Sequence, residues 1–306
     1  MQEFGRQIID LIKKTIEKWR EDNVSRLAAA LAFFTVLSIP SLLALVILIA
    51  GQVIGESNAR QFILGEAGTL AGVEARNALA SILETANKPD GMTLAAMTSV
   101  AILFFSASGM LVQLQDALNT IWNVQADPQQ GIIGTIKQRV FSFIVVIAIG
   151  LIIVVLLLAN TFVSTLGQSL DTLLPFSIGW ARILTPAVSF LIFILLIATL
   201  FKTLPNVEIG WKEVGIGSLV TGLLLGFGII GLNLYFQYRN PTASYGTAGS
   251  LMALLLWIYY SGQMLFLGAE FTDVYAKEYG NQIKPDDDAI WSLTVRQGES
   301  GIHTYQ

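Results

Sequence analysis

The chain has 306 residues, of which 54% are hydrophobic and 13% are charged, with a net charge of -4 and a mean hydropathy of +0.63. A soluble domain carries about a quarter charged residues, so the composition excludes an ordinary soluble fold and indicates an integral membrane protein. Lys and Arg form no basic stripe, there is no cysteine, and the only histidine, His303, lies in a polar tail. We therefore expect no nucleic-acid partner, no bound metal and no cofactor.

Residues 1–26 precede the first long apolar stretch and are expected to form an amphipathic helix. Their apolar residues recur at helical spacing, whereas the charged residues take other faces. This pattern is typical of a helix that lies on the cytoplasmic lipid surface, with membrane lipids as its partner. A helix that binds a partner protein is the alternative. The apolar positions are Phe4, Ile8, Leu11, Ile12, Ile16 and Trp19.

Six stretches without charged side chains follow in chain order. Each holds about the 20 apolar residues that a helix needs to cross the hydrocarbon core of a bilayer. The sequence therefore predicts an all-α membrane protein in which residues 27–280 form one transmembrane domain of six helices. The expected spans are 27–51, 92–115, 140–166, 183–201, 214–238 and 246–269.

The basic residues predict the orientation of these spans. Six crossings place both termini on one side, and 13 of the 18 Lys and Arg residues fall on that side. Because loops rich in Lys and Arg stay in the cytoplasm, both termini are expected to be cytoplasmic. The five basic residues expected outside are Arg60, Arg76, Lys88, Arg182 and Arg239.

Two segments outside the spans have their own character. Residues 56–90 are too long for a hairpin loop, carry regularly spaced apolar residues and end in the turn sequence Lys88-Pro89-Asp90-Gly91. They are expected to form a helical cap outside the membrane. Residues 281–306 are acidic and poor in apolar residues, which predicts a mobile cytoplasmic tail.

Polar residues inside the spans are the candidates for a functional site, because an unsatisfied polar group in hydrocarbon costs several kcal/mol. In the first span, Ser38 and Pro40 are assigned to the substrate pathway. Pro40 removes a backbone donor, which predicts a kink or a locally opened helix, and a kink that only shapes helix packing is the alternative. In the second span, Gln113, Asp116 and the adjacent Asn119 lie on or beside one helical face. This face is interpreted either as the lining of a substrate pathway or as an interface between helices.

The fifth span combines small and amide side chains. Ser218, Gly222 and Gly226 follow at intervals of four residues, which favours close helix packing and would permit a homodimer. Asn233 and Gln237 continue this face toward the outer end and are assigned to the substrate pathway.

The sixth span places Tyr259, Gln263 and Glu270 on a common face. Glu270 closes the span at its cytoplasmic end, where it is interpreted as a proton-responsive or cation-pairing group, or as a hydrated interfacial carboxylate. All three residues are included in the expected substrate pathway.

Several sequence motifs resemble the YihY/virulence factor BrkB family over nearly the whole membrane region. That family is one of bacterial inner-membrane proteins with six predicted spans, which implies a multi-pass protein of the bacterial cytoplasmic membrane. The motifs are Ala28-Ala29-Ala30-Leu31-Ala32-Phe33-Phe34-Thr35, Leu37-Ser38-Ile39-Pro40, Asn119-Thr120-Ile121-Trp122, Leu204-Pro205-Asn206, Tyr245-Gly246-Thr247-Ala248-Gly249-Ser250, Leu256-Trp257-Ile258-Tyr259-Tyr260-Ser261 and Gly268-Ala269-Glu270.

An older label of this family, ribonuclease BN, implies a nuclease. A nuclease needs a carboxylate cluster that holds metal ions, or a histidine acid-base pair, together with a basic groove for phosphates. Asp116 and Glu270 are far apart in the sequence and His303 stands alone in the tail. We therefore expect no enzymatic activity and no catalytic residues.

Three functions remain after this exclusion. The preferred one is a transporter or translocator of a lipid or lipid-linked envelope precursor, which the family's association with the cell envelope implies. A small-solute or ion exporter and a non-transporting envelope scaffold are the alternatives. Lipid transport predicts a lateral opening between helices, a transporter of any kind predicts a lined cavity, and a scaffold predicts polar groups that are paired in a dry bundle.

Overall fold

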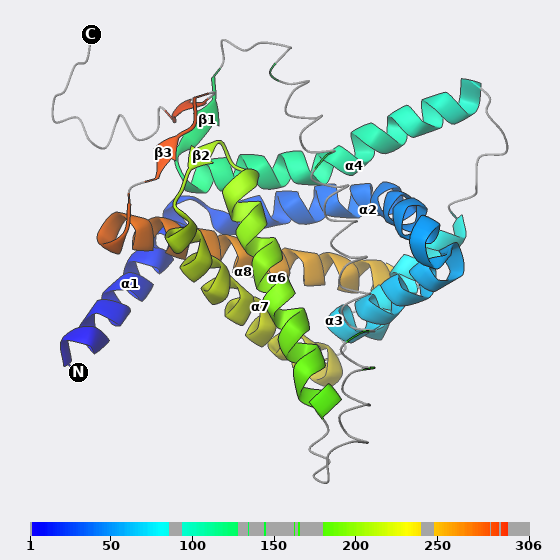
Figure 1. Ribbon diagram of the computed structural model, residues 1–306, viewed down its shortest axis with the longest axis horizontal. Coiled ribbons are helices and arrows are strands. Elements are labelled where there is room, and N and C mark those ends of the chain that lie inside the picture. Colours follow the sequence, from blue (N-terminus) through cyan, green and yellow to red (C-terminus); the bar gives the residue numbers. More distant parts are fainter. Residues whose placement is uncertain are drawn as a thin grey trace.

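The computed structural model describes residues 2–85, 94–127, 180–239, 248–281, 283–287 and 289–292, with single positions 134, 144, 162 and 165. The described part is mostly helical, and its few strands are short (Figure 1). Its helices are α1 (Gln2–Glu21), α2 (Val24–Ile54), α3 (Glu56–Thr85), α4 (Leu94–Ile121), α6 (Trp180–Thr203), α7 (Trp211–Arg239) and α8 (Gly249–Tyr279). Its strands are β1 (Val124–Ala126), β2 (Val207–Glu208), β3 (Lys284–Pro285) and β4 (Ala289–Trp291).

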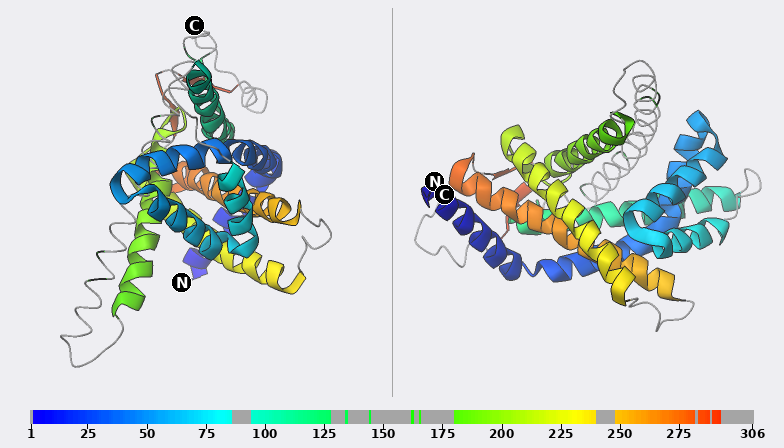
Figure 2. Two further views of the ribbon diagram at one scale, coloured as in Figure 1. Left: turned by 90° about the vertical axis from the view of Figure 1, so that its right-hand side faces the viewer. Right: turned by 90° about the horizontal axis from the view of Figure 1, so that it is seen from below.

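Helices α2, α4 and α8 run along the molecule from one end to the other (Figure 1). We call the end with α1 and the strands the α1 end, and the opposite end, where α2 turns into α3, the α3 end (Figure 1). Helix α2 packs between α4 and α8, α7 packs against α8, and α6 packs on α7. Helix α3 returns from the α3 end and contacts α2 and α8. The other views show the same arrangement (Figure 2). Helix α7 crosses α8, and α6 lies on the side of α7 that faces away from α8.

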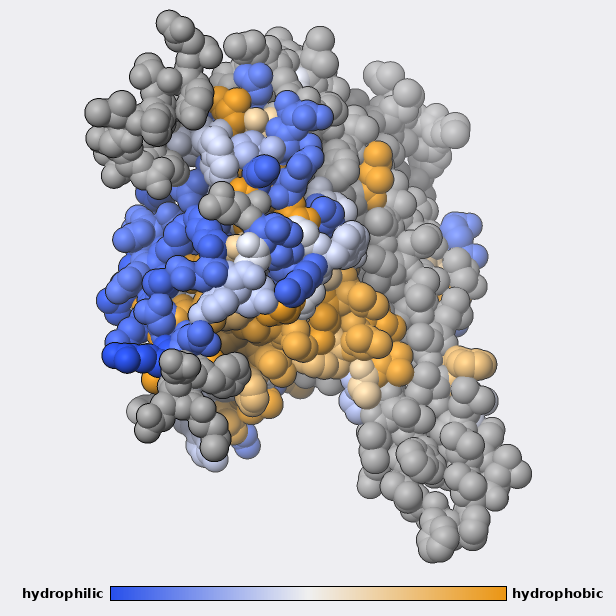
Figure 3. All heavy atoms as spheres, turned by 60° about the vertical axis from the view of Figure 1, so that its left-hand side comes forward, coloured by the Kyte–Doolittle hydropathy of each residue, from blue (hydrophilic) through white to orange (hydrophobic). Residues whose placement is uncertain are grey.

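Four helices in the described part are long and apolar enough to span a membrane. These segments are Val24–Leu43, Pro186–Thr203, Trp211–Tyr238 and Gly249–Tyr279. Large apolar side chains point outward from them, among them Phe33, Leu191 and Phe227, which is 72% exposed. A band of hydrophobic surface lies beside the hydrophilic surface of the α1 end (Figure 3). Lipid is the solvent that such outward apolar side chains require.

The expectation of six spans is met only in part. Residues 94–115 of the expected span 92–115 lie in helix α4, but α4 is not among the four candidates found in the described residues. The expected span 140–166 lies outside the described residues, apart from positions 144, 162 and 165. The structure therefore supports a multi-pass helical protein with four candidate spans.

The N-terminal helix is present and docks on the end of α8. Its Trp19 packs against the main hydrophobic core, while Ile8, Ile9, Ile12 and Ile16 remain exposed. Helix α1 thus uses one face for an intramolecular contact and leaves an apolar ridge uncovered. Asn23, with φ of 51°, separates it from α2, and asparagine is one of the few residues that adopt this left-handed conformation readily.

Helix α2 runs without interruption through Pro40, so the proline does not open the helix. The helix ends at Gly55, whose φ of 85° is accessible to glycine at no steric cost and turns the chain into α3. The expected cap of residues 56–90 corresponds to α3, which is a single helix up to Thr85. Residues 86–90 lie outside the described part.

The segment after α8 begins with paired strands. Strand β3 pairs with β2 in the α6–α7 connection, and β4 pairs antiparallel with β1, which follows α4. Ile283 is buried at the start of this segment. The first residues of the acidic tail therefore form backbone hydrogen bonds with the segment after α4 and with the α6–α7 connection, which satisfies backbone groups on both sides. Residues 293–306 lie outside the described part.

Helices α7 and α8 approach most closely through two reciprocal glycine-threonine contacts. A Cβ atom on Gly217 would collide with Thr272 Oγ1, and a Cβ atom on Gly268 would collide with Thr221 Oγ1. Each threonine hydroxyl donates to a carbonyl of its own helix, Thr221 to Gly217 O and Thr272 to Gly268 O, both at 2.7 Å. The two helices thus interlock through a small residue and a threonine on each side, a packing that small residues permit in membranes.

Candidate functional site

Beyond the interlocked half, residues of α7 and α8 line a groove. The groove has a volume of about 380 Å³ and begins at Leu225 and Met264. It continues toward the α3 end, where Tyr235 and Tyr260 border it and are each almost half exposed. Glycines on α7 supply much of the space. The complete lining is Leu225, Gly228, Ile229, Gly231, Leu232, Tyr235, Tyr260, Ser261 and Met264.

The groove is apolar with three hydroxyl groups, those of Tyr235, Tyr260 and Ser261. Its volume falls within the roughly 300–1,000 Å³ of small-ligand sites, which are mostly apolar with a few polar groups. Gly231 contributes open space, since a Cβ atom there would meet no atom within 4 Å in the described part. An apolar chain with a polar end is the kind of molecule that this lining can hold.

At the α1 end, an amide cluster ties α4 to the loop between α6 and α7. Asn119 Nδ2 donates to Asn206 Oδ1 at 2.9 Å, and the Asn206 backbone N–H donates to Asn119 Oδ1 at 2.9 Å. Gln115 Nε2 also donates to Asn206 Oδ1, at 3.1 Å. Asn119 and Gln115 are buried, so these bonds satisfy groups that would otherwise be costly. The cluster fixes the loop in place and is paired internally.

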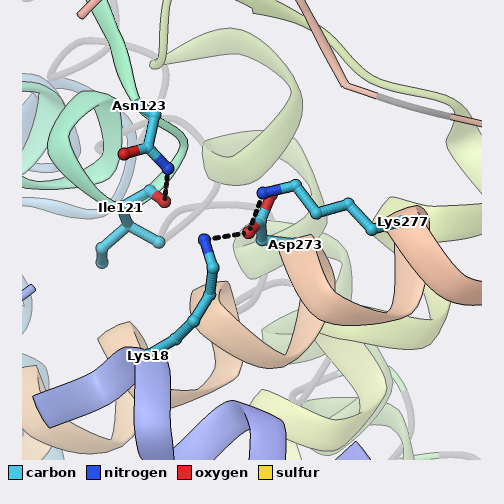
Figure 4. A network of polar contacts seen from close by, with 5 residues as sticks. All are labelled: Lys18, Ile121, Asn123, Asp273 and Lys277. Carbon is cyan, nitrogen blue, oxygen red and sulfur yellow. Dashed lines mark hydrogen bonds and ion pairs between the residues drawn. The ribbon is translucent and has the colours of Figure 1, made fainter. Parts of the chain in front are cut away.

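A second polar cluster lies where α1, the turn after it and α8 meet. Asp273 is buried, and its Oδ2 accepts from Lys18 Nζ at 2.7 Å and from Lys277 Nζ at 2.8 Å (Figure 4). Burial alone would lower the pKa of Lys18, but attraction to Asp273 and the hydrogen bond with it outweigh this effect and raise that pKa. Lys14 adds an exposed ion pair with Glu278 at 2.8 Å. The pairs of Lys18 and Lys14 hold α1 against α8.

Two further carboxyl groups belong to this cluster. Glu270 is fully buried, and neither of its oxygens meets a hydrogen-bond donor in the described part of the chain. Asp22, in the turn after α1, interacts with Glu270, and its Oδ2 is also buried and meets no donor among the described residues. Burial raises the pKa of the Asp22 carboxyl, although the charge of Lys18 acts in the opposite direction.

Glu213 closes the same end of the molecule from α7. Its Oε1 accepts from the Asn281 backbone N–H at 3.0 Å, just beyond the end of α8. Its side chain fills the space where Gly210 and Gly280 would carry a Cβ atom. Glu213 thus fixes the end of α8 against the start of α7, which is a structural role.

The predicted pathway residues do not form one cluster in the structure. Asn119 bonds to Asn206 and Glu270 faces Asp22, whereas Asp116 is exposed and Gln113 is half-buried. The other residues of the set are spread along the helices. Ser38 is buried near Gly109, Pro40 and Gln237 are exposed, Asn233 and Gln263 are half-buried, and Tyr259 packs against the core beside Tyr260.

The residues assigned to helix packing are also distributed. Ser218 is buried and bonds to Gly215 O at 3.0 Å, and Gly222 lies against Ile194 of α6. A Cβ atom on Gly226 would meet no described atom within 4 Å. The face with the closest α7–α8 contact is instead that of Gly217 and Thr221, one residue from the predicted positions.

Sequence reasoning missed Asp22, Lys18 and Asp273 as members of a site. Lys18 and Asp22 belong to the segment that was predicted to be a surface helix. Asp273 lies beyond the predicted end of the last span. One feature of the sequence could have indicated the site: Asp273 follows Glu270 by three residues, so both lie on the same face of a helix. Among the described residues there is no group of three or more metal-binding side chains suited to hold a metal ion.

Comparisons with known proteins give a family and no structural precedent. The chain matches the family described as "Virulence factor BrkB" over residues 15–290. Proteins named UPF0761 membrane protein are similar to it. The one from Verminephrobacter eiseniae is 28% identical over 84% of this chain and 60% of its own length, and that from Delftia acidovorans is 26% identical over 84% and 60%. The protein from Psychromonas ingrahamii is 25% identical over 88% of this chain and 91% of its own length.

This chain therefore spans about 60% of the length of some of these relatives. No solved structure matches it.

Proposed function

Because the chain belongs to the virulence factor BrkB family of membrane proteins, we propose that it translocates a lipid or lipid-linked envelope precursor across the bacterial cytoplasmic membrane. The observation that carries the proposal is the lateral groove between α7 and α8. A scaffold has no need of such an opening. A translocator needs one, because an acyl chain must leave the bilayer and return to it without crossing water.

The geometry of α7 and α8 supports this role. The two helices interlock tightly at Gly217 and Gly268, which fixes their relative position in one half. In the other half, the space beside Gly231 of α7 is open, since no described atom lies within 4 Å of its Cβ position. A groove with one rigid end and one open end can accept a chain-like molecule while the helix pair stays intact.

The chemistry of the groove also fits an amphipathic substrate. The apolar wall made by Leu225, Ile229 and Leu232 suits an acyl chain, and the Tyr235 and Tyr260 hydroxyls stand at the end nearest the α3 end. Tyrosine is enriched where apolar and polar phases meet, because its ring is apolar and its hydroxyl is polar. With both termini in the cytoplasm, as the basic residues predict, this end belongs to the outer leaflet.

The proposal is tested by lipid movement in proteoliposomes that contain the purified protein. A fluorescent phospholipid should exchange between leaflets faster than in protein-free vesicles. Gly231→Phe should block this exchange, because the phenyl ring enters the open space of the groove. Gly215→Phe is the matched control, since Gly215 lies on the same helix, outside the groove, with no described atom within 4 Å of its Cβ position.

The outcomes separate the three functions. Lipid exchange that Gly231→Phe abolishes and Gly215→Phe preserves supports translocation through the groove. Movement of small ions without lipid exchange would favour a solute exporter. No movement of either would favour a scaffold, and equal exchange in the two variants would exclude the groove as the route.

A further inference from the structure

The cluster at the α1–α8 contact has an unequal number of opposite charges. Lys18 and Lys277 supply two positive charges, and both ammonium groups bind the same oxygen of Asp273 (Figure 4). Asp22, Glu270 and Asp273 supply three carboxyl groups. If all were ionised, these five groups would carry one uncompensated negative charge.

The uncompensated charge falls on Asp22 and Glu270. Glu270 is fully buried and neither of its oxygens has a donor among the described residues, and Asp22 Oδ2 is in the same situation. The two carboxyl groups interact with each other. Two carboxylates that share a buried site without donors cannot both remain ionised at acceptable cost.

We propose that Asp22 and Glu270 form a proton-binding site, in which one carboxyl group is protonated and shares its proton with the other while α1 is docked on α8. The protonated group then supplies the donor that the pair lacks, and a hydrogen bond from a carboxylic acid to a carboxylate is a strong one. The bound proton also makes the charge of the cluster zero. One proton therefore accounts for both the missing donor and the missing positive charge.

Other charged groups of the surrounding described helices are placed elsewhere. On α2 the single charged residue, Arg26, is exposed, and on α4 the single one, Asp116, is exposed. On α7, Glu213 is bound to the Asn281 N–H. The charged groups that act on the pair come from α1, through Lys18 and Glu21, and from α8, through Asp273.

The site exists only in the docked arrangement. Asp22 follows α1 directly, and Glu270 lies on α8, so undocking of α1 separates the two carboxyl groups and releases the proton. Docking of α1 and proton binding are therefore linked, and each favours the other. A role of this proton as the coupling ion of lipid translocation rests on the proposed function. The proton-binding site itself does not.

The test is an infrared spectrum of the purified protein in lipid nanodiscs, which requires no transport. At neutral pH the wild-type protein should show the C=O stretch of one protonated carboxyl group. Both Asp22→Asn and Glu270→Gln should lack it, because each leaves two carboxylates for two lysines. Glu278→Gln, which removes an exposed carboxylate of the same contact, is the control and should keep the band.

Survival of the band in either single variant would overturn the proposal. If a variant fails to fold, the wild-type spectrum still decides, since absence of any protonated carboxyl band at neutral pH contradicts a shared proton. Raising the pH should abolish the wild-type band and, in the same range, reduce disulfide formation between cysteines placed at Lys14 and Glu278. The natural chain has no cysteine to interfere. Cross-linking that stays constant while the band disappears would refute the link to α1 docking.

Discussion

The interlock of α7 and α8 gives the sharpest test of the fold. In Gly217→Ala, the new methyl group would collide with Thr272, which is fully buried and cannot move into solvent. Overpacking of this kind costs typically ~1–3 kcal/mol, and the severity of this collision places it at the upper end. Replacing glycine by alanine within a helix regains about 1 kcal/mol. The expected net loss of stability is therefore about 2 kcal/mol, from these two terms.

A swap of the two residues separates packing from all other effects. Gly217→Thr with Thr272→Gly removes one helical glycine and adds another, so that the intrinsic helix preferences nearly cancel. The threonine can then occupy the space vacated on α8. We expect the double variant to lie within about 1 kcal/mol of the wild type, with a coupling energy in the roughly 0.5–3 kcal/mol range seen for contacting residues.

The assay is reversible denaturation in mixed micelles, monitored by circular dichroism, for the wild type, both single variants and the swap. Gly215→Ala is the control, because a Cβ atom there meets no atom of the described residues within 4 Å. It should be neutral or stabilising. Gly217→Ala that is as stable as Gly215→Ala, or a swap no better than the sum of its single changes, would show that the two helices do not meet at these residues.

Three further predictions concern the α1 end. Asn119→Ala should lower the stability by about 1–2 kcal/mol, because the partly buried Asn206 N–H loses its acceptor, and thermal unfolding in detergent measures this loss. Glu213→Gln should change stability little, since the amide oxygen can still accept from Asn281, whereas Glu213→Ala should be clearly destabilising in the same assay. Asp22 has a pKa in the folded state above its unfolded value of about 3.9, so its contribution to stability is complete below that pH and is lost as the pH rises through the folded value. The unfolding temperature of Asp22→Asn relative to wild type should therefore increase from pH 4 upward, and a difference that is constant with pH would contradict the burial of this carboxyl group.

The membrane helices were accessible to sequence reasoning because hydropathy depends on local composition. Apolar runs predicted residues of α2, α6, α7 and α8 with errors mainly at their ends. The expected sixth span ended at 269, but α8 continues to Tyr279. Hydropathy shows where the apolar residues end, whereas the helix ends where the backbone leaves the helical conformation, here at the C-cap Gly280.

The site was less accessible, because it depends on contacts between distant parts of the chain. Glu270 was recognised as notable, but its neighbour Asp22 comes from the turn after an apparently peripheral helix. Small residues in α7 indicated close packing, yet Ser218 and Gly222 repeat at the same interval as Gly217 and Thr221. Spacing alone does not say which of these faces meets α8.

The groove could not be predicted from residue types at all. Gly228 and Gly231 line the groove because this part of α7 faces α8, and the way in which two helices face each other is a property of their packing. The same glycines on a lipid-facing surface would have no such consequence.

The proposal that a lipid chain enters the groove between α7 and α8 can be tested directly by measuring which residues such a chain contacts. A phospholipid with a photoactivatable acyl chain can be crosslinked to the protein in nanodiscs, and the labelled peptides can be mapped by mass spectrometry. We expect labelling concentrated at Tyr235, Tyr260 and Met264, lost in Gly231→Phe and retained in Gly215→Phe. Labelling no denser there than at the outward-facing Leu219 and Leu223 of the same helix, and unaffected by Gly231→Phe, would contradict it.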